Sequence, residues 1–162
     1  MSAADDPRLI EGRAALRETL LEALLQTPRT IDLLSYALEP ALYGSAEFAD
    51  ALKRCLLASE QARLRLLLNQ VQLAAQNAPR LLDLIQRLPS RIECRSLDEP
   101  DRVRLEERLI AAPDCVIERV APEALQARIW RADPASVRIK RQHFEALWVR
   151  ASAATEMRSL GL

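Results

Sequence analysis

Two spacings of hydrophobic residues alternate along the chain, one typical of helices and one typical of buried strands. Stripes repeating every three or four residues predict helices near residues 16–25, 45–56, 79–88 and 134–151. Between the first three lie short, mostly apolar runs that predict strands at 31–38 and 63–68. After the third helix, Ile92 and Cys94 alternate with charged residues, which predicts another short strand with one solvated face. The first helix is expected to end at Thr27-Pro28, because a proline disfavours a helical residue before it.

The order of these elements predicts the fold. Helix and strand alternate through residue 94, which favours a parallel sheet covered by helices. After a polar connector at 97–102, residues 108–111 and 115–117 flank a proline-containing turn and predict a hairpin, and 125–130 predict one more strand. Ser45 and the pair Asp133-Pro134 are typical helix starts.

These elements predict one α/β domain with three layers, in which helices cover a mixed but mostly parallel sheet. We expect the domain to span residues 12–152, after a flexible N-terminus at 1–11 and before a tail at 153–162. The length of 162 residues and a hydrophobic content of 49% are enough for one sizeable core.

The net charge of the chain does not indicate a class of binding partner, but the charge of one segment does. The 23 basic and 23 acidic side chains cancel, so no overall attraction to nucleic acid or anionic lipid is expected. Residues 125–162 are nevertheless basic, and we take four arginines there as candidate anion ligands: Arg128, Arg131, Arg138 and Arg141. With Trp130 and Trp148 they could grip phosphates and stack on bases. Alternatively, Trp148 belongs to the core and the arginines are ordinary surface residues.

Several classes of site are excluded by residue type and spacing. Only three glycines occur, which excludes a glycine-rich phosphate loop. Cys55, Cys94 and Cys115 lie far apart and, with one histidine, cannot form a zinc site of normal spacing. No metal or cofactor is therefore predicted, and the cysteines are interpreted as small buried residues.

Neither the lone histidine nor the paired carboxylates predict a catalytic centre. His143 falls on a predicted helix without an evident partner, so we expect it at the surface. Glu106 and Glu107 are adjacent on a strand, where neighbours point to opposite faces, and are interpreted as solvated charges. The acidic N-terminus lacks an apolar signal core, and no run is long enough to span a membrane, which predicts a cytoplasmic protein.

Several segments carry a resemblance to known families. The closing pattern Phe144-Glu145-Ala146-Leu147-Trp148 is similar to that of the phospholipase-D-like fold. The segments 38–43 (Leu-Glu-Pro-Ala-Leu-Tyr), 66–68 and 88–93 (Leu-Pro-Ser-Arg-Ile-Glu) resemble an uncharacterised proteobacterial domain family with that fold. Members of this family are sometimes fused to GNAT-type acetyltransferases. The resemblance covers about residues 12–152.

The resemblance implies the fold of the phospholipase D superfamily but not its catalytic activity. Active phospholipase D members carry the motif H-x-K-x4-D, in which the histidine attacks phosphorus and the lysine binds phosphate oxygens. Here Glu106 stands at the histidine position, Arg108 at the lysine position and Pro113 at the aspartate position, with Asp114 one place later. A carboxylate would repel the substrate anion. No catalytic residue is therefore predicted, and Glu106, Arg108 and Asp114 are kept as candidate ligand-binding residues.

Three functional hypotheses remain open. The first is a non-catalytic binding or regulatory module of bacterial origin for an anionic ligand or nucleic acid. The second is a structural or protein-interaction protein that acts through a dimer surface, since a single domain of this kind could pair symmetrically as a homodimer. The third is a phosphodiester-acting enzyme with a divergent site that would draw on Glu106, Arg108, Asp114 and His143.

Overall fold

One sheet organises the molecule. The structure, a computed structural model, describes residues 6–155 and 157. Within them the sheet has eight strands in the order β1-β7-β6-β5-β2-β3-β4-β8. The strands are β1 (Arg8–Glu11), β2 (Thr30–Ser35), β3 (Arg63–Leu68), β4 (Ile92–Ser96), β5 (Glu107–Ala111), β6 (Cys115–Arg119), β7 (Gln126–Trp130) and β8 (Ser152–Ala153).

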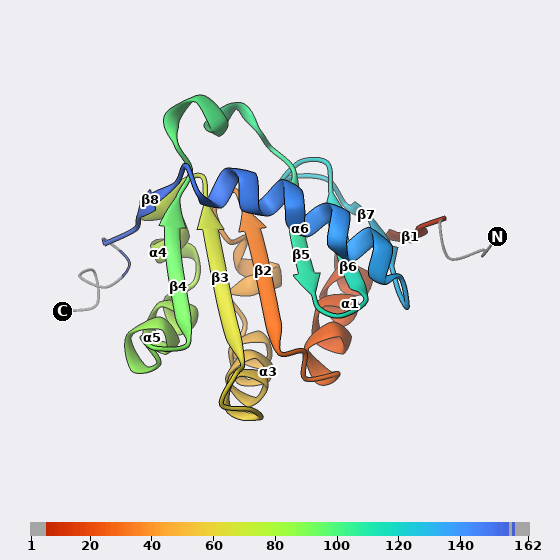
Figure 1. Cartoon of the computed structure of the whole chain (residues 1–162), viewed down its shortest axis with the longest axis horizontal. Coiled ribbons are helices and arrows are strands. Elements are labelled where there is room, and N and C mark those ends of the chain that lie inside the picture. The colour runs from red at the N-terminus through yellow and green to blue at the C-terminus, as the bar shows by residue number, and fades with distance from the viewer. Residues whose placement is uncertain (1–5, 156, 158–162) are drawn as a thin grey trace.

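Helices cover both faces of this sheet unequally. They are α1 (Arg13–Leu25), α2 (Pro40–Tyr43), α3 (Ala46–Leu57), α4 (Val71–Asn77), α5 (Pro79–Arg87) and α6 (Pro134–Trp148), with a short 3-10 helix, η2 (Glu99–Val103). Figure 1 shows α1, α3, α4 and α5 on one face, while α6 is the one described helix that crosses the other face. This arrangement confirms the predicted three layers.

The prediction of a mostly parallel sheet was wrong. Only the pairs β2–β3 and β3–β4 are parallel, and every other pair is antiparallel. Helices α2 and α3 connect β2 to β3, and α4 and α5 connect β3 to β4. The chain therefore begins each of these three strands at the same edge of the sheet. After β4 the chain crosses through η2 and enters β5 from the opposite edge, so β5 runs antiparallel to β2. The turn between β5 and β6 then reverses the chain again, so that β6 runs antiparallel to β5.

The structure confirms the predicted helix caps and adds elements that were not predicted. Ser45 caps α3 by accepting from the Phe48 N–H, and Asp133 caps α6 by accepting from the Ser136 N–H, as predicted. Helix α2 is not among the predicted helices, and its first residue is a proline. Strand β1 lies inside the segment expected to be flexible, whose residues 1–5 fall outside the described residues. The domain limits of 12 and 152 otherwise stay a prediction.

Two apolar clusters lie on opposite sides of the sheet. The larger fills the space between the sheet and helices α1, α3 and α5. The smaller lies under α6 and includes Phe144 and Trp148. Strand alternation divides β5 between them, with Leu109 in the larger cluster and Ile110 in the smaller. Side chains of neighbouring residues on β5 therefore enter two different environments.

Candidate functional site

The three candidate motif residues do not come together. Glu106 precedes β5 and forms an ion pair with Arg104 at 3.0 Å. Arg108 lies near the start of β5, whereas Asp114 lies in the turn beyond its end, at the opposite edge of the sheet. The structure therefore gives no single site that contains all of Glu106, Arg108 and Asp114.

Arg108 is buried and paired rather than open to a ligand. Its side chain is only 8% exposed, and its Nε donates to Glu118 Oε2 at 2.7 Å across the β5–β6 pair. The Lys140 ammonium donates to the same oxygen at 3.0 Å and lies 5.0 Å from the centre of the Trp130 ring. One carboxylate thus accepts from two cations, and the guanidinium at the lysine position of the motif is already neutralised.

This cluster predicts a pH-dependent contribution to stability. Burial opposes ionisation of Glu118, but Arg108 and Lys140 outweigh it and hold the pKa of the carboxyl below its ordinary value of 4.5. A lowered folded-state pKa stabilises the fold above the unfolded value, and that contribution disappears as the pH falls through the folded value. We expect Glu118→Gln to be less stable than the wild type at neutral pH. Urea unfolding curves should converge below pH 4.5, and a constant difference would contradict the expectation.

Glu107 is buried, which corrects its interpretation as a solvated charge. It is 2% exposed, and its Oε2 accepts from the Ser35 hydroxyl at 2.7 Å and from the Tyr36 N–H at 2.8 Å. Its Oε1 forms a short ion pair with Arg119 of β6. The period of two along β5 could have found this side chain, because Glu107 shares a face with Leu109.

Arg119 joins this carboxylate to two loops. Its Nη1 donates to Glu39 at 3.0 Å and to the carbonyls of Pro122 and Ala124 at 2.8 and 3.0 Å. Burial and the charge of Glu107 raise the pKa of the nearby Tyr43 hydroxyl far above its ordinary value, so this group stays protonated. The cluster therefore holds β2, β5 and β6 together and offers no unpaired nucleophile.

A third ionic cluster lies on the face that α6 covers. Asp32, which is buried, accepts from Arg65 Nε at 2.8 Å and pairs with Arg141 at 3.4 Å. Arg65 also donates to Glu145 at 2.6 Å. These contacts attach α6 to β2 and β3 through charges of both signs.

Trp148 is not available for stacking on bases. It is 5% exposed and stacks on Phe144, with ring centroids 5.7 Å apart. Arg65 and Arg95 lie against its ring at 5.2 and 4.4 Å. Of the two sequence-based alternatives for Trp148, the structure supports the core residue.

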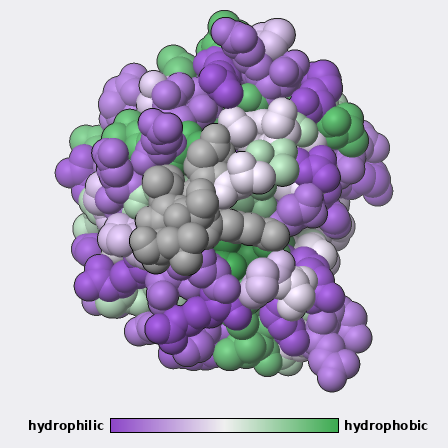
Figure 2. Space-filling view, turned by 90° about the vertical axis from the view of Figure 1, so that its left-hand side faces the viewer, coloured by the Kyte–Doolittle hydropathy of each residue, from purple (hydrophilic) through white to green (hydrophobic). Residues whose placement is uncertain are grey.

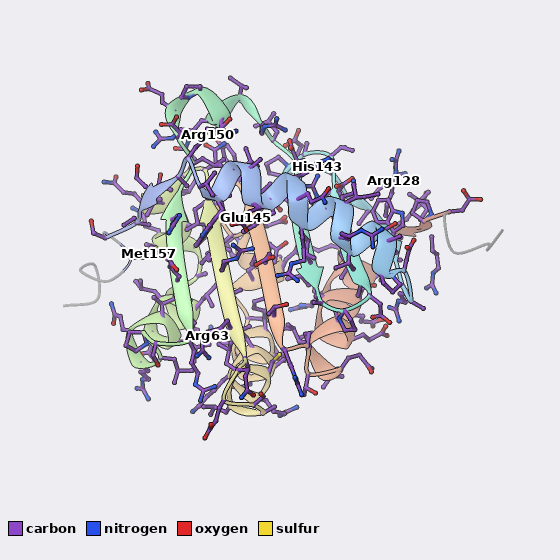
Figure 3. The ribbon with its side chains drawn as sticks, viewed as in Figure 1. Arg63, Arg128, His143, Glu145, Arg150 and Met157 are labelled. Carbon is purple, nitrogen blue, oxygen red and sulfur yellow. The ribbon has the colours of Figure 1, made fainter. Side chains whose placement is uncertain are left out.

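The four candidate anion ligands fall into separate groups. Arg138 and Arg141 lie one turn apart on α6 and line a shallow hollow of about 520 Å³ beside Gln142. Arg128 is exposed on β7, and Arg131 pairs with Glu22 of α1 at 2.8 Å. Figure 3 places Arg128 and Arg150 near opposite ends of α6, with His143 between them on the helix. His143 is exposed, as predicted.

The cysteines do not form a metal centre. Cys55 is buried, whereas Cys94 and Cys115 are half-buried, so the prediction of burial holds fully only for the first. Burial raises the pKa of the Cys55 and Cys115 thiols to about 11. Among residues 6–155 and 157, no cluster of histidine, cysteine and carboxylate side chains could hold a metal ion. In that same range no helix has the length and apolar character needed to cross a bilayer.

The sequence matches the model of one protein family, described as "Domain of unknown function (DUF7931)", over residues 12–160. The chain belongs to this family. No curated protein matches the DUF7931 chain. The family match begins after β1, so that strand is an addition to the matched region in this structure.

Solved structures confirm the phospholipase-D-like fold of the DUF7931 chain. TrmBL2, an archaeal chromatin protein whose structure shows a novel mode of DNA binding, has a TM-score of 0.67 and 16% identity. The match covers 95% of this chain but only 56% of TrmBL2. Nuc from Salmonella typhimurium, a phospholipase D family member, gives 0.63 and 13%, covering 91% of this chain and 98% of Nuc. NucT from Helicobacter pylori gives 0.60 and 8%, with the same coverage.

Proposed function

We propose that this DUF7931 chain is a non-catalytic phospholipase-D-like domain that binds nucleic acid through the exposed side of α6. The absence of catalysis is proposed from the residues that stand at the H-x-K-x4-D motif positions. Glu106 replaces the histidine that would attack phosphorus, and the Arg108 charge is already satisfied by Glu118. A cytoplasmic location and a bacterial origin belong to this proposal.

The choice of nucleic acid rests on α6 and on one structural neighbour. Arg138 and His143 are exposed, and Arg138 has no ion-pair partner in the part of the chain that the structure describes. Arg141 pairs only loosely, at 3.4 Å, and its side chain is 41% exposed. TrmBL2, which shares the fold, binds DNA. Basic side chains along one helix face are suited to phosphate contacts, which position a protein without reading sequence.

Fluorescence anisotropy with labelled single-stranded and duplex DNA and RNA tests this proposal. We expect binding that weakens with salt, because each phosphate contact releases a counterion. Arg138→Ala should weaken binding uniformly across sequences and lower the salt slope by about one. Arg87→Ala is the matched control, since Arg87 is exposed on α5, on the other side of the sheet, and pairs with Asp83. No binding at low salt, or equal effects of the two variants, would contradict the proposal.

The enzyme hypothesis has less support. It needs Glu106, Arg108, Asp114 and His143 in one cleft, but β5 separates Arg108 from Asp114, and His143 is exposed on α6. We expect no hydrolysis of bis(p-nitrophenyl) phosphate above the buffer rate. Turnover that is lost in Arg108→Ala, with the fold intact, would restore this hypothesis.

A homodimer is the alternative if nucleic acid does not bind. Exposed apolar residues lie at the η2 end of the molecule, where Val103 is 82% and Val149 is 66% exposed. On the side of β4 and β8, Figure 2 shows mainly hydrophilic residues with small separate hydrophobic patches among the coloured residues. For this alternative we expect a dimer that uses the η2 end, and light scattering of the wild type and of Val103→Asp would test it.

A further inference from the structure

A second candidate site lies at the edge of the sheet opposite Glu106. A cavity of about 620 Å³ opens where β2 begins and β5 ends, next to the end of α1. This volume falls within the range of small-molecule sites. Its lining comes from α1, the segment before β2, the β5–β6 turn and the residues after β7. Nothing in the nucleic-acid proposal uses this cavity.

Small apolar side chains form much of the cavity wall. Ala23, Ala111, Ala112, Pro28 and Pro113 line it, and Ala23 and Ala111 are nearly inaccessible to solvent. Their methyl and methylene groups leave space without offering hydrogen bonds. Water in contact with such a wall lacks polar partners, so an apolar group can replace it favourably.

The charged side chains that line the cavity include both signs in equal number. Two arginines, Arg29 and Arg131, are balanced by two acids, Glu22 and Asp114. A polyanion would meet both carboxylates, so the balance favours a molecule with a single negative group. Arg29 has no ion pair within residues 6–155 and 157, and Arg131 has one, with Glu22.

Arg131 is the group best placed to receive that charge. Its pair with Glu22 uses one N···O contact at 2.8 Å, and both side chains are about half exposed. Such exposed pairs open at little cost, and the other guanidinium donors remain for an acceptor. Arg131 and Cys115 line the same cavity, and the positive charge of Arg131 offsets part of the effect of burial, which raises the pKa of the Cys115 thiol to about 11.

The backbone around the cavity is held in an uncommon conformation. Thr27 and Ala132 both have positive φ, at 47° and 52°, and both line the cavity. Residues other than glycine adopt this region at a cost, and such positions gather at binding sites. The same two segments supply Pro28 and Arg131, so the uncommon turns determine where these lining residues lie.

We propose that this cavity binds a compact organic molecule with an apolar body and one carboxylate. The apolar body lies against the alanine and proline wall, and Arg131 receives the carboxylate. Cys115 lies beside the bound molecule and reports its presence. The thiol is a reporter only, because a pKa of about 11 leaves it protonated at neutral pH.

Protection of Cys115 from a thiol reagent tests the proposal. The experiment uses a Cys94→Ala variant of the full chain. Because Cys55 is buried, Cys115 is then the one half-buried thiol in the described part. Reaction with a disulfide reagent is followed with hexanoate or benzoate at millimolar concentration, and with the matching amides. We expect the carboxylates to slow labelling in a saturable way and the amides to have little effect. Amide shifts of Ala111 and Ala112 in an NMR titration provide a second readout.

Matched variants decide whether Arg131 is responsible. Arg131→Met should weaken carboxylate protection about tenfold, the usual loss for a charge-assisted hydrogen bond. Arg128→Met on β7, outside the cavity, should leave it unchanged, and Gln26→Trp at the cavity wall should abolish it. Equal protection by amides and carboxylates, no effect of Arg131→Met, or no saturable response in either readout would overturn the proposal. None of these results depends on whether DNA binds.

Discussion

Replacing Glu107 by alanine is expected to lower the free energy of unfolding by about 3–5 kcal/mol. The substitution leaves the buried Arg119 guanidinium without its closest counter-charge and removes the acceptor of the Ser35 hydroxyl and the Tyr36 N–H. A buried charge that loses its closest counter-charge costs far more than a lost surface pair, and the remaining contact of Arg119 with Glu39 offsets only part of this cost. Urea denaturation followed by circular dichroism would measure the change.

The neighbouring carboxylate supplies the control. Glu106→Ala removes an ion pair with Arg104, whose side chain is half exposed, and should cost less than about 1 kcal/mol. Replacing both partners in Glu107→Met/Arg119→Met should recover part of the loss, because no buried guanidinium then lacks its closest counter-charge. Similar costs for Glu107→Ala and Glu106→Ala would show that the buried pair does not support the fold as described.

Replacing Phe144 by alanine is expected to cost a similar amount, about 3–5 kcal/mol. Phe144 is fully buried under α6, stacks on Trp148 and lies 5.1 Å from the Arg65 guanidinium. Since α6 is the one helix on its face of the sheet among the described residues, a cavity there weakens the attachment of the entire layer. Thermal and urea unfolding would both report the loss.

The same helix offers a matched control for this second substitution. Ile139 is 48% exposed on α6, so Ile139→Ala should change stability by only about 0.5 kcal/mol. A small loss for Phe144→Ala would mean that the ionic contacts of Asp32 and Glu145 hold α6 without the aromatic pair. We also expect Phe144→Ala to weaken nucleic-acid binding, because it loosens the helix that carries Arg138.

The sequence predicts the order of elements better than their directions. The run of leucines around Leu66 located β3, and the alternation of Ile92 and Cys94 with charged residues located β4, because both patterns are short and bounded by turn residues. The direction of β5 could not be predicted, since it depends on where the connector through η2 enters the sheet. Helix α2 was not predicted: it is only four residues long, too short for a repeating stripe, and it begins with Pro40, which is well tolerated in a first helical turn.

The candidate site was less predictable, for a physical reason. The position of Arg108 came from the motif alignment, but its pairing with Glu118 depends on the register of β5 against β6. The cavity beside Arg131 brings together four chain segments that are distant in sequence, and no local pattern indicates it. Local periodicity therefore predicted elements, whereas the ion pairs and cavities required the tertiary arrangement.

Strand β1 has a practical consequence for anyone who prepares this domain as a fragment. It pairs with β7 over four residues, and it places Ile10 in the main core. A fragment that began at residue 12, where the family match begins, would remove that core side chain and leave the outer edge of β7 unpaired. Bare strand edges recruit other chains. Such a fragment should self-associate, and its oligomers would then be artefacts of truncation, unrelated to how the full chain assembles.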